Sequence, residues 1–278
     1  MIELRNLSFA YGKGRNAISD ANGTINPGIH LLLGENGAGK TTLLHILAGL
    51  RFAQSGECLI DGSDVRRRLP STMRNLFFVP DNTELLTRTI NGMKKIHASF
   101  YPNFSAELLE DNLRQFGLTG DERFNNLSLG DRNKTLAAYA LSLQTELLLL
   151  DEPANGLDIN SKKTLRRMIA SNCSESQTII VSTHTVWDLK ALFDGLLVMN
   201  HGRLLLSRST EEISRRLCFI TSAMPVTDAI YQEQEAGIYR AIVRNTGNEE
   251  TEVDFNLVYS ALMSEFAKDI INTIIKQD

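Results

Sequence analysis

Long hydrophobic runs are missing from this 278-residue chain. No uninterrupted apolar stretch approaches the roughly 18–20 residues that span a bilayer. Glu3 and Arg5 interrupt the N-terminus where a secretory leader would carry its apolar segment. We therefore predict neither a membrane span nor a leader. If the protein acts at a membrane, we expect it to do so by binding a membrane partner. The sequence also lacks internal repeats and low-complexity segments.

Cysteine is scarce and the charges nearly balance. Cys58, Cys173 and Cys218 show no metal-ligand spacing, and their odd number favours a reducing compartment with unreactive thiols. The net charge of −4 and an isoelectric point near 5.8 give no reason to expect a nucleic-acid partner. Three arginines at 66–68 form the one basic cluster, which is typical of a solvated turn. With 42% hydrophobic residues, the composition indicates a globular protein with a sizeable core.

A glycine-rich segment lies between an apolar run at 29–33 and an apolar helical pattern at 43–50. It fits the P-loop pattern G-x-x-x-x-G-K-[ST] and consists of Gly34, Glu35, Asn36, Gly37, Ala38, Gly39, Lys40, Thr41 and Thr42. Glycines let successive backbone N–H groups turn around a phosphate, and the following helix directs its N-terminal dipole at the same anion. In this motif the lysine reaches the β- and γ-phosphates and the threonine contacts Mg²⁺. The alternative, a structural glycine-rich turn, is disfavoured by the strand–loop–helix setting.

Alternating strand and helix patterns predict the α/β class, with a mostly parallel central sheet and helices on both faces. Strands are expected at 2–9, 17–25, 29–33, 57–61, 75–79, 147–150, 178–182, 196–199 and 203–206. Helices are expected at 105–116, from 128 onward, at 159–170 and at 186–193. We assign a P-loop nucleoside-triphosphatase fold with an N-terminal antiparallel β-subdomain and an all-helical insertion at about 84–143.

The pattern changes after residue 216. Residues 238–243 predict one strand, and 257–275 predict an amphipathic helix capped by Asp254 or Asn256. We therefore divide the chain into a nucleotide-binding domain at 1–216 and a small α+β accessory extension at 217–278.

Two carboxylates, Asp151 and Glu152, follow four consecutive leucines at 147–150. Such a run without alternation is typical of a central parallel strand buried on both faces. Ligands of open α/β sheets bind at the carboxyl ends of the strands. The aspartate could hold Mg²⁺, and the glutamate, pointing elsewhere by strand alternation, could polarise a water for attack on the γ-phosphorus. Ordinary solvated acids are the alternative, which the upstream P-loop disfavours.

The order of the motifs resembles the ATP-binding cassette (ABC) ATPases over about residues 1–210. The matching segments are the P-loop, Leu127-Ser128-Leu129-Gly130-Asp131, 147–153, Asn155-Gly156-Leu157-Asp158 and Ser182-Thr183-His184. This resemblance implies ATP hydrolysis with ATP and Mg²⁺. It also implies two cassettes arranged head to tail, in which the signature loop of one caps the γ-phosphate held by the P-loop of the other. Since the chain has one P-loop, a second, identical cassette is the expected partner.

The resemblance gives each matching residue a role. The catalytic set is Glu152 as general base, His184 as the switch on the γ-phosphate, and Lys40. The metal set is Thr41, Asp81 and Asp151. The nucleotide-binding set is Tyr11 on adenine, the P-loop residues Gly34, Asn36, Gly37, Ala38, Gly39, Lys40, Thr41 and Thr42, and, across the dimer, Ser128, Gly130 and Asp158. Tyr11 could also be a strand-end aromatic, and His184 a helix-start residue.

Two departures from the family pattern stand out. The usual signature is Leu-Ser-Gly-Gly-Gln, but this chain has Leu129 and Asp131 at the third and fifth positions. Asp131 suits the dipole of the following helix but not a nearby triphosphate. Asp81 replaces the usual glutamine after the strand at 75–79. We expect Asp81 to bind Mg²⁺ directly and to make hydrolysis more metal-dependent.

Looser matches at 78–81, 101–104, 155–158 and 183–189 resemble the ATPase subunits of bacterial exporters of antibiotics, bacteriocins and other hydrophobic drugs. These subunits serve a separate membrane permease, which implies a cytoplasmic protein at the inner face of the membrane. One alternative is a soluble ABC ATPase acting on DNA repair or the ribosome, which the absence of coiled-coil insertions and basic arms disfavours. Another is a regulatory nucleotide-binding module with weak turnover, which the intact catalytic set disfavours.

Overall fold

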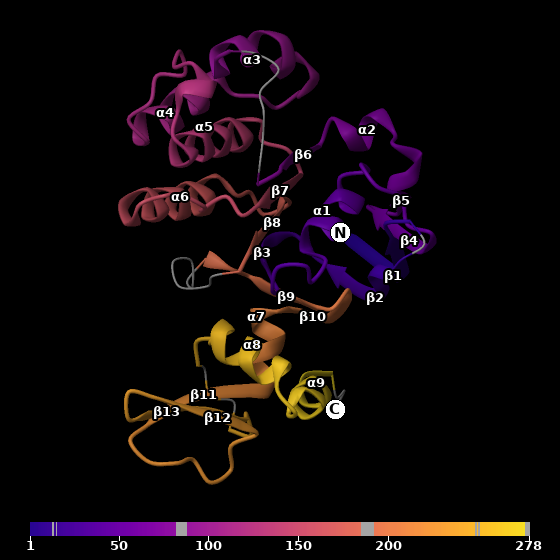
Figure 1. Ribbon diagram of the computed structural model, residues 1–278, viewed down its shortest axis with the longest axis vertical. Coiled ribbons are helices and arrows are strands. Elements are labelled where there is room, and N and C mark those ends of the chain that lie inside the picture. The colour runs from indigo at the N-terminus through magenta and orange to yellow at the C-terminus, as the bar shows by residue number, and fades with distance from the viewer. Residues whose placement is uncertain are drawn as a thin grey trace.

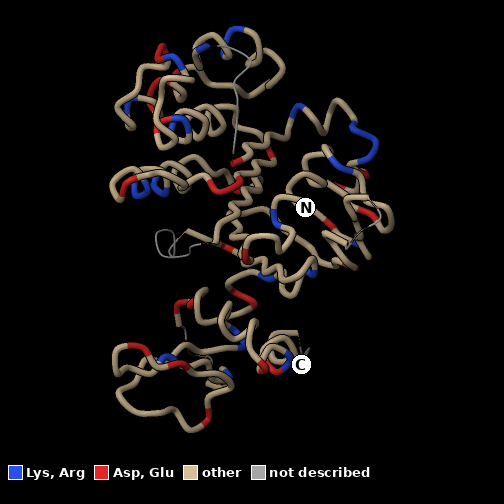
Figure 2. The backbone as a smooth tube through the Cα atoms, viewed as in Figure 1, with Lys and Arg blue, Asp and Glu red and all other residues tan. Residues whose placement is uncertain are grey.

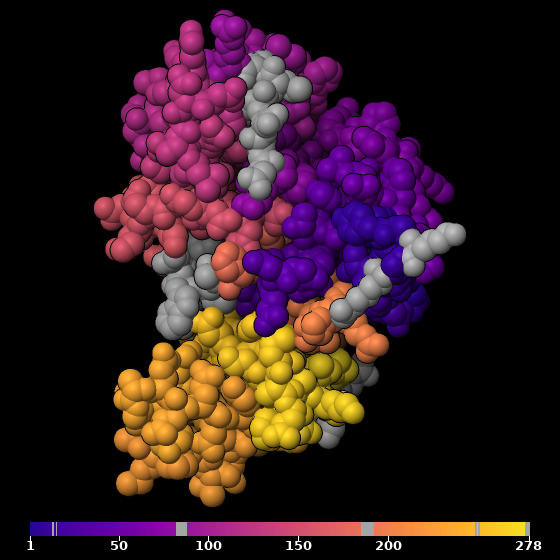
Figure 3. Space-filling model, viewed as in Figure 1, coloured from indigo at the N-terminus to yellow at the C-terminus, as the bar shows by residue number. Residues whose placement is uncertain are grey.

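The computed structural model describes residues 1–12, 14, 16–81, 88–184, 192–247, 249 and 251–275. Figure 1 shows three parts along the long axis: a helical part, an α/β body and a C-terminal extension. The helical part and the extension lie at opposite ends of the molecule (Figure 3). Charged residues of both signs are spread over all three parts (Figure 2). Among the helices of these described residues, none combines the length and the apolar character needed to cross a membrane.

The body is built on a mixed central sheet that has six strands in the described part of the chain. In spatial order they are β10 (Arg203–Ser209), β9 (Gly195–Asn200), β3 (Gly28–Leu33), β8 (Thr178–Thr183), β7 (Leu147–Asp151) and β6 (Leu76–Val79). Neighbouring strands are parallel except β10, which turns back antiparallel on β9 at the sheet edge. This confirms the predicted mostly parallel sheet and the two strands expected at 196–199 and 203–206.

The leucines of β7 bury both faces of this sheet. Leu148 and Leu150 pack in a hydrophobic cluster with α5 (Leu129–Ser142) and α6 (Ile159–Asn172). Leu147 and Leu149 pack in a second cluster with α1 (Lys40–Leu47) and the N-terminal sheet. Because successive side chains of a strand point to opposite faces, an all-leucine strand fills both layers at once. The predicted burial of this run is confirmed.

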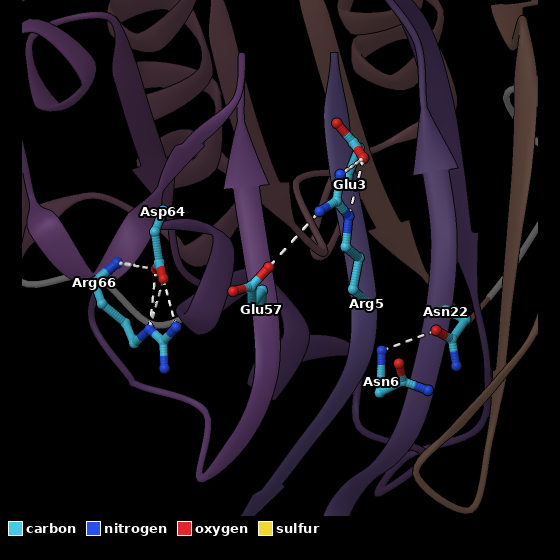
Figure 4. Close-up of polar contacts among 7 residues, drawn as sticks. All are labelled: Glu3, Arg5, Asn6, Asn22, Glu57, Asp64 and Arg66. Atoms are coloured by element: carbon cyan, nitrogen blue, oxygen red, sulfur yellow. Dashed lines mark hydrogen bonds and ion pairs between the residues drawn. The ribbon is translucent and has the colours of Figure 1, made fainter.

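The predicted antiparallel sheet at the N-terminus is present, and its inner face packs against α1. Its strands, in spatial order, are β2 (Asn16–Ile25), β1 (Ile2–Ala10), β4 (Ser55–Ile60) and β5 (Ser63–Asp64). The outward face is polar (Figure 4): Arg5 lies 2.6 Å from Glu3 and 3.8 Å from Glu57, and Asn22 accepts the N–H of Asn6 at 2.8 Å. Exposed ion pairs contribute only about 0–1 kcal/mol. The apolar inner face therefore holds this sheet in place.

The arginine cluster at 66–68 lies in a turn after β5. Asp64 accepts the N–H of Arg66, which starts a short 3₁₀ helix at Val65–Arg67, and also pairs with the Arg66 guanidinium at 2.5 Å (Figure 4). Arg68 ends this turn in the left-handed conformation, with φ of 46°. At least one charge of the cluster is thus used inside a solvated turn, as its sequence suggested. The four-residue helix α2 (Pro70–Met73) follows.

The inserted part is helical, as predicted, and its helices begin at polar caps. It contains α3 (Ile90–His97), α4 (Ala106–Gln115) and α5. Ser105 and Ser128 cap α4 and α5 by accepting backbone N–H groups, which confirms both expected helix starts. Ile96 lies in α3 and Phe100 in the 3₁₀ turn that follows it, and both side chains are about two-thirds exposed, at 65% and 66%.

The extension is more elaborate than its sequence indicated. Besides the expected strand, here β13 (Ile238–Arg244), it contains β11 (Leu217–Ser222) and β12 (Tyr231–Glu235) in the antiparallel order β11-β13-β12. The single helix predicted at 257–275 is wrong. Two helices, α8 (Phe255–Met263) and α9 (Ala267–Ile275), meet at Ser264, whose hydroxyl accepts the N–H of Phe266. Asp254 caps α8, so the alternative cap at Asn256 is also wrong.

The core of the extension is continuous with that of the body. Phe255 packs edge-to-face on Phe193, with ring centroids 6.0 Å apart, and both belong to the cluster that contains Leu148. Helix α7 (Thr210–Arg216) links the two parts and contacts both α9 and β10. The division at residue 216 follows secondary structure rather than a gap in the hydrophobic core, and we keep it as a proposal. The helix expected at 186–193 lies largely outside the described residues.

Truncating Leu148 tests the importance of the buried strand. We expect Leu148→Ala to lower the free energy of unfolding by about 2–5 kcal/mol, because it leaves a cavity in a fully buried position. The midpoint of urea unfolding measures this loss. Leu50→Ala is the control, since that side chain is 52% exposed and should shift the midpoint little. Equal losses in both variants would contradict the central place of β7.

Candidate nucleotide-binding site

The loop between β3 and α1 has the backbone that its glycines allow. Gly37 and Gly39 have φ values of 81° and 109°, which side-chain-bearing residues rarely adopt. A Cβ on Gly39 would lie 2.6 Å from the carbonyl oxygen of Ala17, so this position has no room for a side chain. Behind the loop, Gly34 packs against the carbonyl of Met199, and the Ala38 carbonyl accepts the N–H of Gly202 at 2.9 Å. The β9–β10 hairpin therefore supports the loop from behind.

A cleft of about 310 Å³ opens over this loop. Its lining residues are Tyr11, Ala17, Glu35, Asn36, Gly37, Gly39, Lys40, Thr41, Thr42, Asp81, Asp151 and Glu152. The structure thus brings together most of the residues assigned to the nucleotide and the metal, although they come from elements up to 140 positions apart in the chain.

Lys40, the first residue of α1, is almost fully buried at the floor of the cleft. Its Nζ donates to the carbonyl of Gly34 at 2.6 Å and lies 3.9 Å from the Glu152 carboxylate. Burial lowers the pKa of this amine, while the nearby carboxylates of Glu152 and Asp151 raise it. The ammonium group is held where a phosphate on the loop would lie.

The Asp151 carboxylate is oriented from two sides. Thr41 Oγ1 donates to Oδ2 at 2.7 Å, and Ser182 Oγ donates to Oδ1. Ser182 was part of a motif in the sequence, but no role could be given to it. Only the register of β7 and β8, which pairs Asp151 with Ser182, reveals that it positions the carboxylate.

Glu152 leaves the strand by an unusual backbone turn. It follows the last residue of β7, and its φ is 48°, in the left-handed region that non-glycine residues seldom occupy. Its N–H donates to the carbonyl of Ser182 at 3.0 Å. The explanation from strand alternation is therefore wrong, because the turn and not the strand directs this side chain. Strained residues of this kind often lie at functional sites.

His184 is not among the lining residues of the cleft, but it contacts Glu152, which is. Its Nδ1 lies 2.9 Å from Glu152 Oε1 in a hydrogen bond that the carboxylate accepts. The imidazole is partly exposed, whereas the Glu152 side chain is mostly buried. The pair expected from the sequence is thus in contact. Residues 185–189 of the looser match at 183–189 lie outside the described residues.

Asp81 lines the same cleft but is held by another loop. Its Oδ1 accepts from Asn155 Nδ2 at 2.8 Å, and the carbonyl of Asn155 accepts from Asn133 Nδ2 at 2.8 Å. A chain of hydrogen bonds therefore runs from the cleft to the loop at 155–158 and on to α5. Asn133 belongs to none of the sequence motifs, so this contact could not be predicted.

The donor set suits Mg²⁺ that arrives with phosphates. Among the described lining residues, Glu35, Asp81, Asp151 and Glu152 are acidic and Lys40 alone is basic. An anionic triphosphate needs additional positive charge in such surroundings. Within the described ranges, no group of three or more His, Cys, Asp or Glu side chains could hold a metal by itself. Mg²⁺ commonly binds one or two carboxylates together with substrate phosphates, and the oxygens of Thr41 and Asp151 fit that pattern.

Tyr11 lies at the rim of the cleft with its ring about half exposed. Its hydroxyl is 3.2 Å from Thr42 Oγ1, and Phe9 packs edge-on against the ring. The guanidinium carbon of Arg51 lies 5.4 Å from the ring centroid, a contact that the sequence did not predict. These contacts fix an aromatic face beside the loop, in a place suitable for a stacked base.

The remaining predicted residues form a second group outside this cleft. Ser128 and Gly130 begin α5, and Asp158 caps α6. The two segments touch, since a Cβ on Gly130 would lie 2.4 Å from the carbonyl oxygen of Gly156. Among the described residues, the structure therefore separates the cleft from a signature group made of Ser128, Gly130, Asp131 and Asp158.

A glycine loop between a parallel strand and a helix, with a buried lysine and an oriented aspartate, defines a P-loop nucleotide-binding domain. A family model described as "ABC transporter" matches residues 18–155. The lantibiotic transport ATP-binding protein SrtF of Streptococcus pyogenes is 31% identical over 75% of this chain and 90% of its own length. The sulfate/thiosulfate import ATP-binding protein CysA of Neisseria meningitidis serogroup A is 31% identical over 86% of this chain and 70% of its own.

A solved structure of the ATP-binding subunit of an ABC transporter has the same fold, with a TM-score of 0.67, 24% identity, and coverage of 77% of this chain and 92% of that one. The chain belongs to the ATP-binding proteins of ABC transporters. It is an ATP-binding ABC ATPase, as its motifs indicated.

The Ser182 hydroxyl can be tested by removal. We expect Ser182→Ala to lower kcat for ATP hydrolysis by about 10- to 150-fold, because a hydrogen bond to a charged group contributes about 1.5–3 kcal/mol. Steady-state phosphate release measures the change. Ser171→Ala, which removes a hydroxyl on α6 that bonds the Met168 carbonyl, serves as the control. An unchanged kcat in Ser182→Ala would show that Asp151 needs no second donor.

Proposed function

We propose that this chain is the ATP-hydrolysing subunit of a bacterial ABC exporter of drugs, antibiotics or related hydrophobic compounds. It works as a head-to-tail homodimer at the inner face of the membrane, beneath a separately encoded permease, and uses ATP with Mg²⁺. The likeness to a lantibiotic transport protein and the looser motif matches support export. The likeness to CysA makes import the alternative direction.

The observation that supports a head-to-tail dimer is the separation of the predicted site residues into two groups. The cleft holds Lys40, Thr41, Asp151 and Glu152, whereas Ser128, Gly130 and Asp158 lie at the starts of α5 and α6, outside the cleft lining. A helix N-terminus with a serine cap is suited to an anion. Since these residues do not line the cleft of their own chain, the phosphate that they cap belongs to the second copy.

Each residue of the cleft has a separate role in ATP hydrolysis. Lys40 and the loop amides bind phosphate, while Thr41 and Asp151 hold Mg²⁺, which supplies charge neutralisation when bound. Glu152 accepts the proton of the attacking water, and His184 keeps that carboxylate in place and donates to the γ-phosphate. Catalysis is then positioning and electrostatic stabilisation without a covalent intermediate.

The helical part supplies the surface for the permease. Ile96 in α3 and Phe100 in the 3₁₀ turn that follows it are well exposed, and Asp81, which lines the cleft, precedes the insertion in the sequence. Exposed apolar side chains of this kind mark interaction sites. Closure of the dimer on ATP would move this surface relative to the body and pass the motion to the membrane partner.

Removal of the general base tests the dimer and the chemistry together. We expect Glu152→Gln to lower kcat by about 100-fold or more and to trap an ATP-dependent dimer on size exclusion. The ATPase rate of the unmodified protein should rise faster than linearly with its concentration. Glu107→Gln, on the exposed face of α4, is the matched control.

Other results point to other functions. ATP binding without turnover or dimerisation would favour a regulatory module, and turnover stimulated by nucleic acid would favour a non-transport ATPase. Co-purification with a permease, followed by transport assays in vesicles of defined orientation, separates export from import.

The role of Asp81 can be tested by the dependence of the ATPase rate on Mg²⁺. If Asp81 binds Mg²⁺, Asp81→Gln should raise the Mg²⁺ concentration for half-maximal hydrolysis about tenfold, because one charged ligand is lost. Titration of the ATPase rate with Mg²⁺ measures the shift, and Asp111→Asn on α4 is the control. An unchanged Mg²⁺ dependence and rate would exclude direct ligation.

A further inference from the structure

In the signature group, Asp131 accepts a hydrogen bond from Ser128, the serine that is expected to bind phosphate. Ser128 Oγ donates its proton to Asp131 Oδ2 at 2.8 Å and accepts the N–H of Asp131 at 3.1 Å. A serine hydroxyl has a single proton. In this arrangement the proton points at Asp131, so the hydroxyl must rotate before it can donate to another anion.

Lys134 lies next to this acid, one turn further along α5. Its Nζ is 2.9 Å from Asp131 Oδ1 and 3.8 Å from Asp158 Oδ2. The hydrogen bonds from Lys134 and Ser128 lower the pKa of Asp131, and those from Ser161 lower the pKa of Asp158 to about 2. Both carboxylates are therefore ionised at neutral pH, with one ammonium group between them.

The position of Lys134 differs from that of an ordinary helix-surface lysine. Its side chain is only 15% exposed, although lysine is seldom buried unless it is paired. It joins the starts of two helices, α5 and α6, at the place where Gly130 and Gly156 are in backbone contact. The ion pair thus belongs to the surface that carries Ser128 rather than to α5 alone.

We propose that Lys134 is a positioning residue for ATP held by a second copy of this chain: it neutralises Asp131, so that a signature loop bearing an acid can receive a triphosphate. The inference rests on the head-to-tail dimer proposed above. With Asp131 paired to Lys134, the Ser128 hydroxyl can turn from the carboxylate to a phosphate oxygen. Without that pairing, the ionised Asp131 would keep the hydrogen bond from the Ser128 hydroxyl and would repel the phosphate.

The test measures the ATP-dependent dimer of the Glu152→Gln protein by analytical ultracentrifugation. Lys134→Met should weaken this dimer about tenfold, since it leaves Asp131 uncompensated beside a triphosphate. Asp131→Asn should strengthen it, because the repulsive charge is removed and the Ser128 proton is released. In the D131N background, Lys134→Met should have less than about a twofold effect. Lys134→Arg keeps the charge and should preserve the dimer.

Each outcome separates the two proposals. If the Glu152→Gln protein forms no ATP-dependent dimer, the proposed function fails. If the dimer forms but Lys134→Met weakens it equally with and without D131N, Lys134 has only a structural role and the inference is overturned. The same holds if Asp131→Asn does not strengthen the dimer, a result that is independent of how well Lys134→Met folds. Binding of a fluorescent ATP analogue to the monomer should be unchanged in Lys134→Met, since Lys134 lies outside the cleft lining.

Discussion

The carboxylate of Asp151 is the point at which the elements of this protein meet. A strand of four buried leucines delivers it, the first turn of α1 binds one oxygen through Thr41, and β8 binds the other through Ser182. The same β8 residue accepts the N–H of Glu152 as the chain turns away. Because both sheet faces are filled by side chains of β7, any shift of this strand would displace the carboxylates of Asp151 and Glu152 and the P-loop helix together.

Charge is the second constraint on the site. Among the described residues that line the cleft there are four acids and one lysine, which suits a nucleotide that brings its own divalent cation. The signature group likewise places two carboxylates near a site for phosphate, with Asp131 and Asp158 on either side of Lys134. In both places an acid that would repel phosphate is tolerated because a cation stands beside it. The acid at position 131, which departs from the family motif, is therefore accompanied by a compensating charge on Lys134.

Apolar packing joins the accessory extension to the body. Phe255 and Phe193 share one cluster with Leu148 and Leu150 of β7, so the extension is anchored in the main core. Its sequence predicted one of three strands and merged two helices, because apolar periodicity continues across the break at Ser264. A single hydroxyl that caps the chain at this point gives no periodic signal. Short strands such as β12, with alternating exposed polar residues, likewise resemble loops.

The sequence by itself determined the P-loop, the buried leucine strand, the helix caps at Ser105 and Ser128, and the residue types of the site, because each depends on neighbours within a few positions. Tertiary structure alone decided that Ser182 orients Asp151, that Asn155 holds Asp81, that Arg51 lies on Tyr11 and that Lys134 lies between Asp131 and Asp158. These contacts join segments that approach only when parallel strands align and loops pack. Local pattern cannot reveal them, since their geometry is set by the register of the whole sheet.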